Sequence, residues 1–259
     1  MGQFQTKRMI EQIRRNDTRL GIHVDFNRRE LGVKGAQTLS EALAHNSTVQ
    51  KLYLDGNSIG NEGVIALSEA LTRNSTLRII GLSWNQIGTE GAVALSEALK
   101  RNNTLEFIVL QGNNIGDTGA RALSDALTQN NSIRRIFLDN NDIGVEGAKA
   151  LSEALKRNNT LEWILLRGNN IGDEGAIALS EALKQNSTLQ YIDLRGTQIG
   201  KDGVPALVET LKHWNGTLTA LYVYPNPDFY EDNAVKKEIN ELQERNRQGK
   251  GPCGTANSR

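Results

Sequence analysis

Apolar residues recur along this 259-residue chain in a unit of 28 residues, and polar residues follow them at fixed distances. Isoleucine and glycine return with that step from Ile59 and Gly60 to Ile199 and Gly200. An asparagine precedes each isoleucine by two residues, and Thr197 takes the last of these places. The asparagines are Asn57, Asn85, Asn113, Asn141 and Asn169. A fixed period of roughly 20 to 50 residues predicts a stacked array of repeats.

The first half of each unit has the pattern of a short strand. When the unit is numbered so that asparagine occupies position 9, apolar residues fill positions 1, 4 and 6, as in Leu105, Ile108 and Leu110. The alternation at positions 4 and 6 predicts a strand with one buried face. Side chains at positions 3, 5 and 7 then point to the opposite face.

The second half of each unit has the pattern of an amphipathic helix. In the segment 173–183, Ala176, Leu179 and Leu183 lie on one stripe, as expected for a helix that packs against a core. Asp173 is expected to cap the start of this helix. Asn186 is expected to end it in a left-handed conformation.

Stacking such units has a geometric consequence. Paired strands lie about 4.8 Å apart, whereas packed helices need roughly 8–10 Å. The sequence therefore predicts an α/β horseshoe with parallel strands on the concave face and helices on the convex face. The asparagine at position 9 is expected to point inward and bond backbone groups of adjacent turns, and Thr197 replaces it only in part.

In the irregular first unit, Arg29 at position 9 keeps the later units in step, whereas Asn27 would require a two-residue insertion.

The repeated motif carries a family resemblance. Leu-x-x-Leu-x-Leu-x-x-Asn-x-Ile-Gly, followed by x-x-Gly-Ala-x-x-Leu-x-x-Ala-Leu, resembles the ribonuclease-inhibitor type of leucine-rich repeat, and most closely the repeat regions of NOD-like receptors. The resemblance covers about residues 20–226 in eight copies. It implies a right-handed superhelical solenoid that serves protein interaction.

The two ends of the chain depart from the repeat and are expected to close the array, because exposed solenoid ends require caps. We expect a capping helix in residues 1–19, 28-residue repeats over 20–230, a second capping helix in 231–248, and a disordered tail in 249–259. Pro225 and Pro227 are expected to stop the repeat pattern. Cys253 lies in the tail.

Composition and motifs argue against several classes of function. The chain has 30 basic and 30 acidic residues, so a general grip on nucleic acid or on an anionic membrane is not expected. A single cysteine and the absence of a signal-peptide pattern favour a cytoplasmic protein. The histidines and acidic residues form no pattern of metal ligands, and no catalytic or nucleotide-binding motif stands in a fitting context. We therefore expect no cofactor, no metal and no enzymatic activity.

Eight glycosylation sequons accompany the repeat, and they too follow its period. All lie at the turn from helix to strand, where asparagine and the following Ser or Thr are expected to bond the turn backbone. Structural use is therefore preferred to glycosylation. The sequons begin at Asn16, Asn46, Asn74, Asn102, Asn130, Asn158, Asn186 and Asn215.

Positions 3, 5 and 7 change freely between units while the framework stays constant, and this variation predicts a protein-binding site on the concave strand face. Aromatic and apolar residues gather there on successive strands, and Trp, Tyr and Arg are common anchors of protein interfaces. The predicted partner-binding residues are Tyr53, Ile79, Trp84, Phe107, Val109, Arg135, Phe137, Trp163, Leu165, Arg167, Tyr191 and Arg195. Trp163 is the expected hot spot, and its replacement by alanine is expected to change stability by no more than about 0.5 kcal/mol.

Several alternatives stay open. The apolar side chains could pack on one another without a ligand, or the face could serve self-association, although a monomer is preferred. A GTPase activator similar to the Ran-specific type shares this repeat, but its acidic C-terminal region has no counterpart here. An engineered consensus protein would also explain the near-identical segments 102–105 and 158–161.

Overall fold

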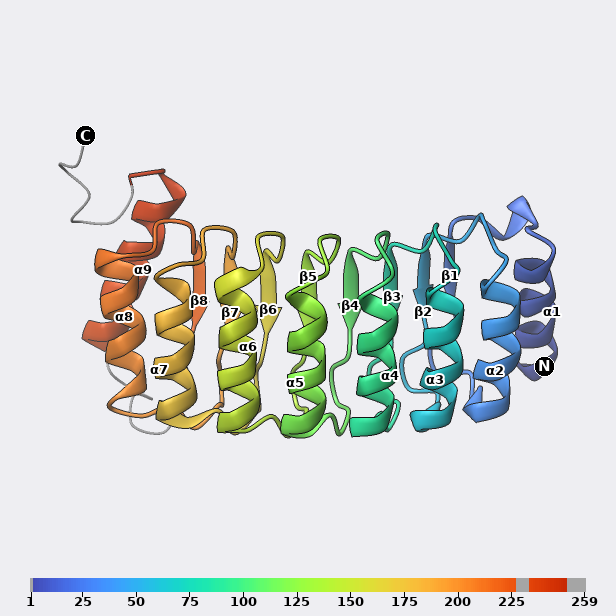
Figure 1. Cartoon of the computed structure of the whole chain (residues 1–259), viewed down its shortest axis with the longest axis horizontal. Helices are drawn as coiled ribbons and strands as arrows, with labels where there is room; N and C mark the ends of the chain where they lie inside the picture. The colour runs from blue at the N-terminus through green and yellow to red at the C-terminus, as the bar shows by residue number, and fades with distance from the viewer. Residues whose placement is uncertain (1, 227–232, 251–259) are drawn as a thin grey trace.

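The computed structural model describes residues 2–226 and 233–250. Within them the chain alternates strand and helix in order along one axis, and Figure 1 shows the helices side by side with the strands behind them. The fold is a right-handed α/β leucine-rich-repeat solenoid, with the strands on its concave face and the helices on its convex face. The predicted fold class is confirmed.

The strands form one parallel sheet in sequence order. Equivalent residues pair at a spacing of 28, and the last pair of strands is spaced by 29 because of the extra residue near Trp214. His23 pairs with Lys51, so Arg29 occupies position 9 and the favoured register of the first unit is confirmed. The strands are β1 (His23–Asp25), β2 (Lys51–Tyr53), β3 (Ile79–Gly81), β4 (Phe107–Val109), β5 (Arg135–Phe137), β6 (Trp163–Leu165), β7 (Tyr191–Asp193) and β8 (Ala220–Tyr222).

The helices follow the same order. The first and last lie outside the repeats, and the 3-10 helix η1 (Thr18–Leu20) leads into the first strand. The helices are α1 (Gly2–Arg14), α2 (Gly32–Leu43), α3 (Gly60–Leu71), α4 (Thr89–Leu99), α5 (Gly116–Leu127), α6 (Val145–Arg157), α7 (Gly172–Leu183), α8 (Gly203–His213) and α9 (Asn233–Arg247).

Two expectations about the helix ends are wrong. Asp173 does not cap its own helix: its Oδ1 accepts hydrogen bonds from the backbone N–H groups of Gly200 and Gly203, at 2.6 and 2.9 Å, and so caps the next repeat. Asn186 also does not take a left-handed conformation after its helix, and the equivalent Asn158 has an extended backbone with φ −76° and ψ 128°, whereas Asn16 after α1 is left-handed with φ 53°. The side chains of Asp173 and Asn186 bond across a repeat boundary, which a single unit cannot reveal.

Aliphatic side chains fill the space between sheet and helices in one continuous core. Strand residues such as Ile108 and Leu110 meet helix residues such as Ala120 and Leu123, and all four are fully buried. Alanine on the helices permits the close approach that a 28-residue unit requires. The core positions 4 and 6 turn inward, so positions 3, 5 and 7 present their side chains on the concave face.

The end helices close the core. Ile10 and Ile13 of α1 are buried against the first repeat. At the other end α9 buries Ile239 and bonds free backbone groups of the last repeat: the Gln243 amide donates to the Leu221 carbonyl, and the Arg245 guanidinium donates to the Leu211 carbonyl. Gly249 and Lys250 follow this helix in a turn, whereas the rest of the predicted tail, with Cys253, lies outside the described residues. No helix in residues 2–226 and 233–250 is long and apolar enough to cross a membrane.

Candidate functional site on the concave strand face

Most of the residues predicted to bind a partner lie on strands β2 to β7 and are half-buried rather than fully exposed. This set contains Tyr53, Ile79, Phe107, Val109, Arg135, Phe137, Trp163, Leu165 and Tyr191. Arg167 and Arg195 lie two residues after the ends of β6 and β7. The parallel pairing places equivalent side chains next to one another across the sheet, so the set forms one surface.

The centre of this surface is an aromatic row made of Trp163, Tyr191 and Tyr222. Trp163 and Tyr191 are stacked with their ring centroids 4.6 Å apart, and Tyr191 and Tyr222 are 5.2 Å apart. The guanidinium of Arg135 lies 4.5 Å from the Trp163 ring, and that of Arg195 lies 5.3 Å from the Tyr222 ring. The row is therefore flanked by arginine at both ends, and each contact orders its neighbours.

Tyr222 was not among the predicted site residues, yet it completes the aromatic row. It occupies position 5 of the last unit, with 40% of its surface exposed. The sequence contains the information to place it there, because Tyr222 falls at position 5 once the extra residue near Trp214 is counted.

Two further aromatic contacts lie closer to the N-terminus. Phe107 and Phe137 meet edge to face at 4.7 Å, one strand from the aromatic row. Tyr53 contacts His23 at 4.9 Å on the first two strands. The structure thus joins Phe107, Phe137 and the aromatic row on neighbouring strands and leaves Tyr53 at a distance of several strands.

Trp84 does not belong to the sheet surface. It lies in the turn after β3, with a backbone φ of 57° and 57% of its surface exposed. Its ring covers Gly112, where an added Cβ would lie 2.3 Å from the indole. Gly168 and Asn140 repeat this arrangement two units later, with 2.1 Å between an added Cβ and the Asn140 Oδ1. From Arg28 to Gly168 a residue with a side chain alternates with glycine at this turn, and Trp84 belongs to that alternation.

Charges on the concave side fall into two groups. Arg78 pairs with Glu106 and Arg134 with Glu162, each pair joining adjacent repeats. Such exposed pairs contribute little to stability. Arg167, by contrast, is exposed and its guanidinium forms no hydrogen bond or ion pair with the described part of the chain.

Two carboxylates are buried next to Arg167. Asp193 is 1% exposed and forms an ion pair with Arg195, whose Nε donates to both of its oxygens at 2.9 and 3.0 Å. Asp139 is 6% exposed, and its Oδ1 accepts from the backbone N–H of Arg167 at 3.1 Å. Burial, reinforced by the charge of Asp193, raises the pKa of Asp139 to about 6.

This pKa predicts a dependence of stability on pH. Because the pKa of Asp139 is higher in the folded state than the ordinary 3.8, its contribution to stability is fully present below pH 3.8 and is lost as pH rises through about 6. Asp139→Asn keeps the Oδ1 acceptor without the charge. We expect this variant at pH 7.5 to exceed the wild type in free energy of unfolding by about 1–3 kcal/mol, and the difference to shrink to about 0.5 kcal/mol near pH 4.

Urea denaturation at the two pH values measures this difference. Asp25→Asn serves as the control, since Asp25 is an exposed carboxylate of β1 that also accepts from a backbone N–H group. An Asp139→Asn variant as stable as the wild type at pH 7.5 would contradict a destabilising charge at this position.

The position-9 asparagines form a buried ladder inside the turns. Asn113 is representative: its Oδ1 accepts from the N–H groups of Asn85 and Ile87, both at 3.0 Å, and its Nδ2 donates to the carbonyls of Leu82 and Leu110 at 3.0 and 2.8 Å. The same side chain thus joins two successive turns. The members are Asn57, Asn85, Asn113, Asn141 and Asn169.

The ladder has fewer hydrogen bonds at two places, Asn141 and Thr197. The Oδ1 of Asn141 is buried and accepts no hydrogen bond. The side chain of Thr197 bonds only within its own turn, from its hydroxyl to the Leu194 carbonyl at 2.6 Å. Asn226 then resumes the pattern by accepting from the N–H groups of Thr197 and Ile199, so the repeat continues one residue past Pro225, whereas Pro227 lies outside the described residues.

The sequon asparagines form a second buried ladder at the other end of the strands, in the turns from helix to strand. Asn74 is 4% exposed, its Nδ2 donates to the carbonyls of Leu43 and Asn46, and its Oδ1 accepts from Thr76 and Leu77. Asn246 of α9 ends this series by donating to the carbonyls of the last turn. The amide nitrogens are buried and bonded in all sequons except the half-buried Asn16, so a glycan on any of the buried ones would be incompatible with the folded turns.

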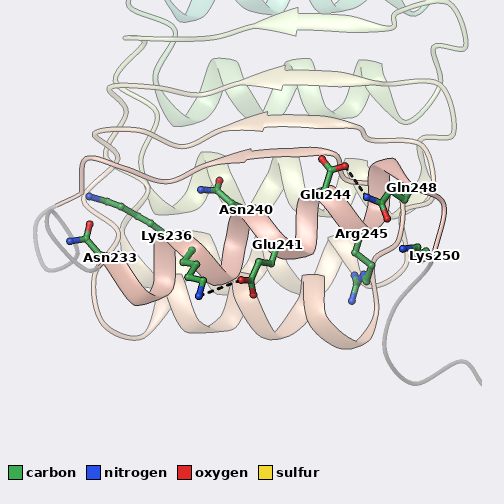
Figure 2. Close-up of a pocket in the computed structure, with 9 residues that line it drawn as sticks. Asn233, Lys236, Asn240, Glu241, Glu244, Arg245, Gln248 and Lys250 are labelled. Carbon is green, nitrogen blue, oxygen red and sulfur yellow. Dashed lines mark hydrogen bonds and ion pairs between the residues drawn. The ribbon is translucent and has the colours of Figure 1, made fainter.

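A larger pocket lies elsewhere, on the outer face of α9. It has a volume of about 710 Å3, and Figure 2 shows its lining of long polar side chains, including Lys236, Glu241 and Arg245. Glu241 pairs with Lys237, and Glu244 accepts from Gln248. The pocket is a shallow hollow between solvated side chains of one helix, so the concave face is the better candidate.

The parallel sheet, the repeated motif and the inward asparagines together define a leucine-rich-repeat protein. A family described as "Leucine Rich repeat" matches residues 129–152, 157–180 and 185–208. A second family, described as "TMOD/LMOD Leucine-rich domain", matches residues 3–139, which is more than half of the chain. The chain therefore belongs to the tropomodulin/leiomodin leucine-rich domain family. This family is non-enzymatic, which confirms the prediction of a non-enzymatic module.

Solved structures of the same family show weak overall similarity. A structure titled "Leiomodin-1 Actin-Binding Site 2 (ABS2)" is 16% identical, covers 94% of this chain and 90% of its own, and gives a TM-score of 0.40. A Caenorhabditis elegans structure titled "tropomodulin C-terminal domain" is 13% identical, covers 94% of each chain and also gives 0.40. No curated protein matches. The expected resemblance to NOD-like receptors finds no support in these comparisons.

Proposed function

We propose that this chain is a cytoplasmic protein-binding module that contacts actin through its concave strand face. Membership of the tropomodulin/leiomodin family supports actin as the partner. The observation that carries the choice of surface is the aromatic row, flanked by Arg135 and Arg195.

The physical argument for this surface is preorganisation. Side chains that already touch one another lose little conformational freedom when a partner covers them, and this lowers the cost of association. Trp, Tyr and Arg also combine a large apolar area with polar groups, as hot-spot residues commonly do. The aromatic row offers both properties on rigid parallel strands.

The experiment is a calorimetric titration of actin with the chain, accompanied by ultracentrifugation of the chain alone. We expect saturable binding to actin by a monomeric chain. A chain that is monomeric and shows no binding to actin monomers or filaments would contradict actin as the partner. Concentration-dependent dimers that disappear in a Trp163→Ala variant would instead assign the face to self-association.

A further inference from the structure

A pocket of about 360 Å3 opens on the concave face at the ends of strands β5 to β7, beside the aromatic row. Its walls include Gln111, Asp139, Leu165 and Arg167, together with the Asp193–Arg195 pair. It is built from side chains of four successive repeats, with Leu165 and Asp193 on the strands and the other residues in the segments that follow the strands.

The acceptors in this pocket are largely engaged by the chain itself. Both oxygens of Asp193 accept from Arg195, and the Oδ1 of Asp139 accepts from a backbone N–H group. A cationic ligand would therefore find Asp193 already paired with Arg195, and of Asp139 only the oxygen that accepts no hydrogen bond.

Unlike these acceptors, the hydrogen-bond donors of Arg167 are not engaged by the described part of the chain. The guanidinium of Arg167 is exposed at the rim and makes no bond to the described residues. A guanidinium has five N–H donors in a fixed fork that matches the two oxygens of a carboxylate. Gln111 adds a neutral amide on the β4 side.

We propose that this pocket receives a carboxylate side chain of the bound partner, held by the guanidinium of Arg167 next to the carboxyl group of Asp139. This proposal rests on the proposed function in so far as the carboxylate belongs to the protein that covers the concave face. It adds the chemistry of the recognised group, an Asp or Glu side chain set beside the apolar anchors.

The pocket also implies a pH dependence. The charged groups that face Asp139 are Arg167 from the turn after β6, and Asp193 and Arg195 from β7 and the turn after it. Asp193 and Arg195 neutralise each other, so an ionised Asp139 opposes a ligand carboxylate, whereas a protonated Asp139 can donate a hydrogen bond to it. Carboxylate binding should therefore strengthen as pH falls.

The size of the effect follows from the population of the protonated form. With a pKa of about 6 for Asp139, roughly 3% of the chain is protonated at pH 7.5 and about three quarters at pH 5.5. Glutamate side chains, with an ordinary pKa near 4.3, stay mostly ionised at both values. If only the protonated form binds, the apparent affinity scales with these populations, and we expect about 25-fold tighter binding of a carboxylate probe at pH 5.5.

The test uses acetylated hexaglutamate as the probe and hexalysine as its counterpart, titrated at low ionic strength and followed by NMR shifts of the Arg167 and Asp139 amides. Hexaglutamate should bind more tightly at pH 5.5 than at pH 7.5. Arg167→Gln should lose binding at both pH values. Asp139→Asn should bind at pH 7.5 as the wild type does at pH 5.5. Arg121→Gln, an equal loss of charge on the exposed side of α5, should bind as the wild type does.

Each contrary outcome overturns the proposal. Tighter binding of hexalysine at pH 7.5 would make the pocket a cation site. An equal loss of hexaglutamate binding in Arg167→Gln and Arg121→Gln would mean that binding depends on net charge alone. The absence of NMR shifts at the Arg167 and Asp139 amides would mean that hexaglutamate does not bind in this pocket. None of these readings involves actin, so the proposal can fail while actin binding stands, and the reverse also holds.

Discussion

Replacing Asn113 by alanine should lower the free energy of unfolding by about 3–4 kcal/mol. Asn113 is 3% exposed and satisfies two backbone N–H groups and two carbonyls of successive turns. Alanine leaves these four groups without partners in a place that water reaches poorly. A buried unpaired polar group costs about 1–3 kcal/mol, and local rearrangement recovers part of that cost. Urea denaturation measures the loss.

The chain supplies a matched control at the next ladder position. Asn141 is as deeply buried and donates to the carbonyls of Leu110 and Asp139, but its Oδ1 accepts no hydrogen bond. Asn141→Ala should therefore cost about 1–2 kcal/mol, roughly half as much. Equal losses in the two variants would mean that cavity formation, and not hydrogen bonding, determines the contribution of the ladder.

Replacing Trp163 by alanine should weaken actin binding by about 2 kcal/mol or more, which is roughly thirtyfold. Trp163 lies at the centre of the concave face between Arg135 and Tyr191, where a partner would cover it fully. The matched control is Ile177→Ala on the convex side of α7, where 40% of the side chain is exposed. Calorimetric titration of both variants against actin gives the comparison. Equal affinities of the two variants for actin would mean that actin does not bind at the aromatic row.

The same substitution should cost more stability than the sequence suggests. From the sequence alone Trp163 has no structural contact, and a change within about 0.5 kcal/mol is expected. In the structure the indole is half-buried, stacked on Tyr191 at 4.6 Å and covered by Arg135 at 4.5 Å. Loss of these contacts should cost about 1–2 kcal/mol, so binding must be compared at a temperature where both variants are folded.

Periodicity was enough to predict the architecture because the fold is made of one unit that repeats. The buried positions, the parallel register and the inward asparagines all follow from the 28-residue step and from the unequal widths of strands and helices. The register around Arg29 could be chosen for the same reason, since only one choice keeps His23 opposite Lys51.

The sequence was less informative where a side chain acts on a neighbouring repeat. Asp173 looks like the cap of its own helix, yet it bonds Gly200 and Gly203 of the next unit. Trp84 looks like a member of the aromatic surface, yet it covers Gly112 in the adjacent turn. A comparison of alternate units, in place of successive ones, would have revealed the pairing of large residues with glycine.

The concave face is the central claim, and a methyl footprint tests it most directly. The chain, labelled at isoleucine, leucine and valine methyl groups, is titrated with unlabelled actin and followed by NMR. We predict that Ile79, Val109 and Leu165 on the strands shift or broaden, whereas Ile65, Val93 and Ile177, exposed on the convex helices, stay unchanged. Changes confined to the convex set would contradict the account.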